Sequence, residues 1–171
     1  MISTPAEGYL TYIRKNHLLQ ELTDEELQQI LRAAVMRNFG ENEVIMQEGD
    51  SGDAMYIMCE GIVQITKRLV LELDEETPRD KVIIRFRAEE GVILGEMALI
   101  ESDVRSATVT ALTPCQMLEL HKDAFYRLLE QFPEMGVKIL LRLTKNLSHR
   151  LRKSSDEVVK LTTALAIALE S

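Results

Sequence analysis

The feature that most constrains the fold is a series of short apolar runs, separated by glycine-containing turns, between residues 40 and 120. Each run is short for a helix and rich in the residue types that favour strands. Many short strands at regular spacing are typical of a closed or double-sheet β architecture. We therefore predict a mainly β core with strands at residues 44–47, 55–59, 62–73, 81–86, 92–94, 107–112 and 116–120. The acidic residues 72–78 are predicted to form an exposed hairpin loop.

A helical segment precedes this β core. Residues 6–38 are predicted to form a helix, a turn and a second helix. Thr23 and Glu26 have the spacing of a capping box at the start of the second helix. The apolar face of that helix then follows at Leu27, Ile30, Leu31 and Ala34.

Helical periodicity returns after Leu120. Pro133 is predicted to end one helix, and a single long helix is predicted to run from Glu134. Part of its apolar seam can pack on the chain's own core. Leu161 and Leu165 lie beyond that reach, so we predict a homodimer through a parallel pair of these helices. The seam repeats every seven residues at Leu140, Leu147, Ser154, Leu161 and Ala168, interleaved with Thr144, Leu151, Val158 and Leu165.

Length and charge set the domain organisation and exclude some partners. The 171 residues fit one domain with an appendage, which we divide into a helical segment (1–38), a β-barrel core (39–121) and C-terminal helices (122–171). The formal net charge of −8 argues against a nucleic-acid partner, so we expect no binding to duplex DNA. The basic residues Arg150, Arg152 and Lys153 are interpreted as solvated helix surface.

Cysteine and histidine usage point to an intracellular protein without a metal. Cys59 and Cys115 lie in apolar runs and are interpreted as core thiols in a reducing compartment. The three histidines have no partners at metal-ligand spacing. The N-terminus lacks the pattern of a signal peptide and the chain lacks a long apolar run, so we expect a cytoplasmic protein that does not span a membrane.

Residues 95–109 have the composition of a phosphate-binding segment. Gly95 permits a tight turn, and the next residues, Glu96, Met97 and Ala98, suit one short helical turn whose free N–H groups and dipole favour an anion. Arg105 can bind two phosphate oxygens at once, and Ser106 adds a hydroxyl donor.

An ionised Glu96 can only accept hydrogen bonds, so it suits a sugar hydroxyl, whereas Arg105 suits a phosphate. The two side chains together predict a site for a ribose phosphate. The alternative is that Glu96 and Arg105 form an ordinary surface ion pair, which stabilises little.

Residues 95–109 resemble the phosphate-binding cassette of cyclic-nucleotide-binding domains, and the resemblance extends over about residues 20–165. It implies a double-stranded β-helix (jelly-roll) barrel with flanking helices. It also implies that Glu96 binds the ribose 2′-hydroxyl, that Arg105 and Ser106 bind the cyclic phosphate, and that the backbone of Gly95, Met97 and Ala98 contributes. Val104 departs from the family's frequent proline, and Glu101 and Asp103 can compete for Arg105.

The turn at residues 49–53 and the strand after it match another signature of the family, which we interpret as architectural. The C-terminal helix resembles the dimer helix of bacterial regulators similar to the catabolite activator protein. That resemblance places Ser154 and Ser155 where those regulators offer hydroxyls to adenine. Their DNA-reading domain has no counterpart in the residues that follow this helix, so we expect no such module.

Three functions are compatible with these features. The first is a stand-alone regulatory module that binds a cyclic nucleotide, cAMP in preference to cGMP, and signals to an unknown partner protein. Because Ser106 can contact either a phosphate or a guanine amino group, cGMP stays open, and Ser154 and Ser155 favour cAMP. The second is a dimerisation or interaction module with a vestigial nucleotide site. The third, a phosphodiesterase, is disfavoured because no His and Asp cluster has two-metal spacing, and we therefore expect no enzyme.

Overall fold

The computed structural model describes residues 5–68, 80–100 and 104–169, so the predicted acidic loop at 72–78 lies outside the described residues. The elements in chain order are α1 (Pro5–Arg14), α2 (Asp24–Ala33), β1 (Val35–Phe39), β2 (Val44–Met46), β3 (Ala54–Glu60), β4 (Ile62–Arg68), β5 (Asp80–Arg87), the 3-10 helix η1 (Ala88–Glu90), β6 (Ile93–Leu94), the 3-10 helix η2 (Glu96–Leu99), β7 (Thr108–Ala111), β8 (Cys115–His121), α3 (Lys122–Gln131) and α4 (Pro133–Leu169).

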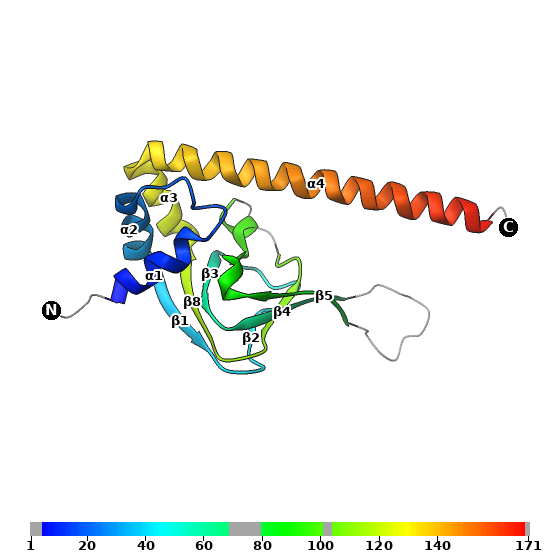
Figure 1. The fold of residues 1–171 in the computed structure, drawn as a ribbon, viewed down its shortest axis with the longest axis horizontal. Helices are drawn as coiled ribbons and strands as arrows, with labels where there is room; N and C mark the ends of the chain where they lie inside the picture. Colours follow the sequence, from blue (N-terminus) through cyan, green and yellow to red (C-terminus); the bar gives the residue numbers. More distant parts are fainter. Residues whose placement is uncertain (1–4, 69–79, 101–103, 170–171) are drawn as a thin grey trace.

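Two antiparallel sheets of four strands each face one another as a jelly-roll barrel (Figure 1). One sheet has the strand order β1-β8-β3-β6, and the other has the order β2-β7-β4-β5. Neighbouring strands in each sheet are therefore often distant in the chain, as in β1 paired with β8. This arrangement confirms the predicted fold class of a double-sheet barrel with flanking helices.

The prediction of helix as far as Asn38 was wrong at its C-terminal end. Helix α2 ends at Ala33, Ala34 is extended, and β1 pairs with β8 from Val35 to Phe39. The apolar helical face includes Ala34, but from Val35 onward the backbone pairs with β8, a strand some 80 positions away in the chain. Long-range pairing of this kind overrides local periodicity.

Strand β3 divides the hydrophobic core into two. It is buried on both faces because its residues are apolar without alternation. Met55, Ile57 and Cys59 join a cluster shared with the helices, whereas Tyr56 and Met58 face the barrel interior. Both cysteines are buried as predicted, and burial raises the pKa of the Cys59 thiol to about 11.

The N-terminal helices and α3 cover the outside of the first sheet and hold the start of α4. The predicted capping box is present: Thr23 Oγ1 accepts from the Glu26 N–H at 3.3 Å, and Glu26 Oε2 accepts from the Thr23 N–H at 2.7 Å. Glu26 also receives two hydrogen bonds from Lys138 Nζ, at 2.8 and 2.9 Å. These bonds join the first turn of α2 to the first turns of α4.

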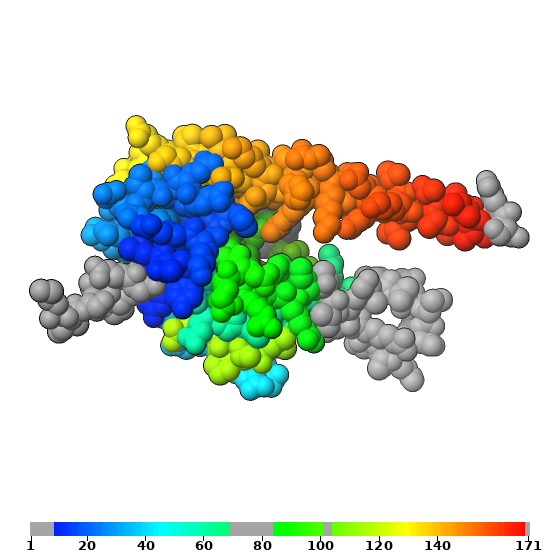
Figure 2. All heavy atoms as spheres, viewed as in Figure 1, coloured from blue at the N-terminus to red at the C-terminus, as the bar shows by residue number. Residues whose placement is uncertain are grey.

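Helix α4 has 37 residues and begins at Pro133, as the position of that proline predicts. At about 1.5 Å per residue it is about 55 Å long. Its first turns bury Met135, Ile139 and Leu143 in the core, and beyond Leu143 its side chains are mostly exposed. Figures 1 and 2 show its C-terminal half extending past the barrel. No helix in the described part of the chain combines the length and apolarity that a membrane span requires.

Candidate functional site

The predicted phosphate-binding segment forms a left-handed turn followed by one turn of 3-10 helix. Gly95 has φ of 74°, a conformation that favours glycine. The Ala98 N–H donates to the Gly95 carbonyl at 3.1 Å, so Glu96 to Leu99 form η2 as predicted. Leu99 is fully buried and fixes this turn to the core, while Met97 stays half exposed. The turn therefore presents Glu96 and its own backbone to the cavity beside it.

Arg105 lies against this turn and is held by backbone groups from another part of the chain. Its N–H donates to the Asp50 carbonyl at 2.7 Å, and its Nη2 donates to the Ala54 carbonyl at 2.8 Å. A Cβ at Gly52 or at Gly95 would collide with the guanidinium. The turn at residues 49–53, which we interpreted as architectural, thus also forms part of the wall that seats Arg105.

One nitrogen of the guanidinium has no hydrogen-bond acceptor among the described residues. Arg105 Nη1 is buried and unpaired, and it is the atom that a Cβ on Gly95 would touch. A buried charged donor without an acceptor is costly, and native proteins rarely leave one unless a ligand or water completes it. This atom therefore marks a position where an anionic oxygen fits.

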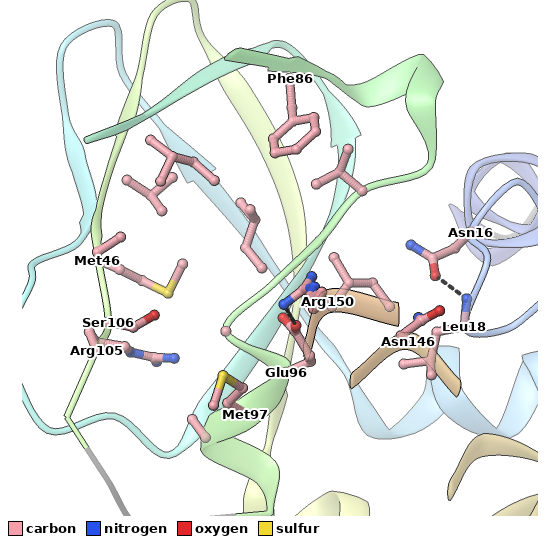
Figure 3. Close-up of a pocket in the computed structure, with 18 of the residues that line it drawn as sticks. Asn16, Leu18, Met46, Phe86, Glu96, Met97, Arg105, Ser106, Asn146 and Arg150 are labelled. Carbon is pink, nitrogen blue, oxygen red and sulfur yellow. Dashed lines mark hydrogen bonds and ion pairs between the residues drawn. The ribbon is translucent and has the colours of Figure 1, made fainter. Parts of the chain in front are cut away.

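The predicted cassette residues line one cavity of about 530 Å³, which lies between the barrel and α4. Gly95, Glu96, Met97, Ala98, Arg105 and Ser106 all border it. Figure 3 shows Arg105 and Ser106 on one wall, Glu96 at the centre and Phe86 at one end. The remaining walls are mostly apolar and include Met46, Ile65, Phe86, Val92, Leu94, Val109 and Leu143. An apolar cavity with a few convergent polar groups is typical of a small-molecule site.

Glu96 and Arg105 do not form the surface ion pair that we considered as the alternative. Arg105 uses the Ala54 carbonyl, and Glu96 Oε1 accepts a hydrogen bond from Arg150 Nη1 of α4 at 2.5 Å. The Glu96 side chain is only 14% exposed, whereas Arg150 is 61% exposed. The competing residues Glu101 and Asp103 lie outside the described residues.

Arg150 is mostly exposed, as the interpretation of solvated helix surface requires, but it also contacts the cassette through Glu96, which that interpretation missed. Arg152 and Lys153, from the same cluster, are exposed. Leu143, Asn146 and Arg150 line the cavity at helical spacing, because α4 lies across its mouth. In the sequence, the helical spacing between Arg150 and the buried Leu143 indicates that the two can share a helix face. That this face lies over the cavity follows only from the direction of α4.

Ser154 and Ser155 lie on the exposed part of α4, one turn beyond Arg150, and do not border this cavity in the single chain. Their predicted contact with a base stays a prediction that concerns the dimer. No group of three or more metal-ligating side chains occurs among the residues that the structure describes.

The model of the cyclic nucleotide-binding domain family matches residues 36–132, more than half of the chain. The chain therefore belongs to the cyclic nucleotide-binding domain family, and the resemblance carried by residues 95–109 is confirmed. The family consists of binding domains that are not themselves catalytic.

Two curated relatives illustrate the family's range. The chain is 29% identical over 133 residues to cGMP-dependent protein kinase, isozyme 1, of Drosophila melanogaster, covering 77% of this chain and 16% of the kinase. It is 31% identical over 127 residues to the cAMP-dependent protein kinase regulatory subunit of Dictyostelium discoideum, covering 74% of this chain and 37% of that subunit. The chain thus spans well under half of the length of either relative.

Solved structures agree with the fold. A cyclic nucleotide-binding domain from Methylobacillus flagellatus is similar with a TM-score of 0.72 and 28% identity, covering 90% of this chain and 82% of that one. The Thermus thermophilus catabolite activator protein has a TM-score of 0.74 at 23% identity, covering 86% of this chain and 63% of that one. The second likeness is one of fold alone.

Proposed function

We propose that the chain is a regulatory module of the cytoplasm that binds a cyclic purine nucleotide in the cavity between the barrel and α4. The observation that carries this proposal is the buried Arg105 Nη1, which lacks an acceptor and lies beside the Gly95 turn. A cyclic phosphate would supply that acceptor through a charge-assisted hydrogen bond. The free, buried cysteines support a reducing compartment.

The proposed position of the nucleotide follows from the chemistry of the side chains that line the cavity. Arg105 and Ser106 would hold the phosphate, with backbone donors from Gly95, Met97 and Ala98. Glu96 would accept from the ribose 2′-hydroxyl with an oxygen that Arg150 leaves available, since a carboxylate has more lone pairs than the one bond from Arg150 uses. The apolar wall around Phe86 suits the base.

We propose cAMP as the preferred ligand over cGMP. The support is the pair Ser154 and Ser155, exposed on α4 one turn beyond Arg150, whose hydroxyls can pair with an adenine edge brought to them in a dimer. The named relatives include proteins dependent on each nucleotide, so they do not favour either.

Signalling would proceed through α4. The Arg150–Glu96 contact joins this helix to the residue that we assign to the ribose, so ligand binding and the position of α4 would be thermodynamically linked. The exposed seam of α4 would form the homodimer, and the changed helix geometry would be read by a partner protein. We propose neither DNA nor a membrane as a partner.

One observation favours the second candidate, an interaction module with a vestigial site. Glu96 already has a protein partner in Arg150, so the site partly satisfies itself. The two candidates predict different results in one experiment. It is isothermal titration calorimetry with cAMP and with cGMP, on protein freed of carried-over ligand by unfolding and refolding. Saturable binding of one ligand to each chain, tighter for cAMP, supports the regulatory module. Titrations in which neither cAMP nor cGMP gives a binding heat support the interaction module.

A further inference from the structure

Arg105 borders a second cavity as well as the first. This smaller space, about 280 Å³, lies against the turn at residues 50–53 and is also lined by Tyr56 and Glu119. The guanidinium is therefore part of a wall between two cavities. The side chains behind it belong to neither the predicted cassette nor α4, and the proposed function assigns them no role.

Behind Arg105 a row of polar side chains crosses the first sheet. Tyr56 on β3 and Glu119 on β8 are directly opposite in the strand register. The Tyr56 hydroxyl donates to Glu119 Oε1 at 2.8 Å, and Arg37 Nε of β1 donates to Glu119 Oε2 at 2.7 Å. His121 Nε2 lies 3.3 Å from the same oxygen. The row connects exposed Arg37 at the sheet edge to the barrel interior.

Both central members of the row are buried in defined protonation states. The Glu119 side chain is 7% exposed and Tyr56 is 9% exposed. Burial raises the pKa of Tyr56 to about 12, with help from its bond to Glu119, so the hydroxyl keeps its proton. Burial acts to raise the pKa of Glu119, but the hydrogen bonds from Arg37 and Tyr56 lower it more. At neutral pH Glu119 is therefore a buried carboxylate, paired with the Arg37 guanidinium at the sheet edge.

Tyr56 and Glu119 border the second cavity together with Arg105. The Ala54 carbonyl that binds Arg105 Nη2 belongs to the residue two positions before Tyr56, on the same face of β3. The Arg105 charge also opposes the rise in the pKa of Tyr56, as a cation near the hydroxyl must. In a buried setting such an interaction is stronger than it would be in water.

We propose that Tyr56 and Glu119 are positioning residues for Arg105, which orient its guanidinium so that Nη1 faces the nucleotide cavity. The inference rests on the proposed function. A free arginine side chain has many rotamers, and ordering one on ligand binding costs affinity. Asp50 and Asp53, which border the same second cavity, offer competing carboxylates to an unrestrained guanidinium. The buried Glu119 carboxylate sets the orientation before the ligand arrives.

The test is a double-mutant cycle between Tyr56→Phe and Arg105→Ala, with cAMP titrations followed by NMR so that millimolar affinities stay measurable. Tyr56→Phe keeps the ring and its edge contact with Phe39, whose centroid lies 5.9 Å away. We expect it to weaken cAMP binding about three- to tenfold in the wild-type background, since the Arg105 side chain must then be ordered when the ligand binds. In the Arg105→Ala background it should add less than about twofold.

Glu119→Gln, which keeps the shape and removes the charge, should weaken cAMP binding in the same manner and serves if Tyr56→Phe does not fold. Tyr126→Phe, at an exposed tyrosine of α3, is the matched control and should bind like wild type. Unchanged cAMP affinity in a folded Tyr56→Phe or Glu119→Gln protein would overturn the inference, and so would an equal loss in both Arg105 backgrounds. Wild-type protein that binds no cyclic nucleotide would instead overturn the proposed function.

Discussion

Gly95 and Arg105 occupy adjoining space, so each limits what the other position can hold. A Cβ at Gly95 would collide with Arg105 Nη1 and would lie 3.1 Å from Met46 Sδ and 3.2 Å from the Ala54 carbonyl. The positive φ of 74° adds strain for any L side chain. The turn therefore requires glycine both for its own conformation and for the seat of the arginine.

Gly95→Ala should lower the free energy of unfolding by about 1–2 kcal/mol through left-handed strain, and should weaken cyclic nucleotide binding through displacement of Arg105. Denaturant unfolding and calorimetry measure the two effects. Gly40→Ala is the matched control, because the nearest atom to its added Cβ is Glu43 Oε2 at an ordinary 3.6 Å. Equal behaviour of the two variants would remove Gly95 from the site.

At this scale the sequence predicted the contiguous part of the site and not the distant part. Residues 95–106 were recognisable because the turn, the short helix and the arginine follow one another within a few positions. Arg150 and Glu119 were missed, because their proximity to this segment depends on how α4 and β8 pack. No local pattern distinguishes a helix arginine that reaches a carboxylate from one that points into solvent.

Among the elements, the strands with apolar runs were predictable and β1 was not. Strand β1 has the sequence Val-Met-Arg-Asn-Phe, which shows neither alternation of apolar and polar residues nor a continuous apolar run. Most of its residues are exposed. Its structure comes from pairing with β8 alone. Helix α4 was predictable in extent, since Pro133 marks its start and the apolar seam continues throughout.

Helix α2 depends on its N-terminal cap, because Thr23 and Glu26 exchange hydrogen bonds there and Glu26 also binds Lys138 of α4. Thr23→Ala should cost about 1 kcal/mol of stability, since a side-chain acceptor for a first-turn N–H is lost. Thermal unfolding measures the cost. Thr163→Ala is the control, because its hydroxyl donates to the Val159 carbonyl within α4 and does not cap a helix. A Thr23→Ala protein as stable as the control would show that the cap contributes nothing.

For the whole molecule, the exposed seam of α4 is the feature that the single chain leaves uncovered. Leu161 is 71% exposed and Leu165 is 60% exposed. Leu147, Leu151 and Val158, earlier in the same seam, are exposed as well. Apolar side chains repeated every seven residues along a projecting helix are typical of a coiled-coil interface. The homodimer is therefore a proposal about the molecule, and it requires its own measurement.

Replacing Leu161 and Leu165 with glutamate should convert a dimer into a monomer, because two charges on each helix would face one another across the seam. Sedimentation velocity at several concentrations measures the change. Thr163→Glu adds a charge away from the seam and should stay dimeric. A wild-type protein that sediments as a monomer at every concentration would contradict the proposed dimer.

Binding in the cavity under α4 depends, in this proposal, on Arg105 holding the phosphate of a cyclic nucleotide. The most direct test of this role is calorimetric titration of cAMP into wild type and Arg105→Ala, with Glu96→Ala as a weaker perturbation and exposed Arg127→Ala as the control. Arg105→Ala should lose about 2–4 kcal/mol of binding free energy, or roughly thirty- to a thousandfold in affinity. Glu96→Ala should lose less, and Arg127→Ala nothing. Wild-type cAMP affinity in a folded Arg105→Ala protein would show that Arg105 does not hold the phosphate.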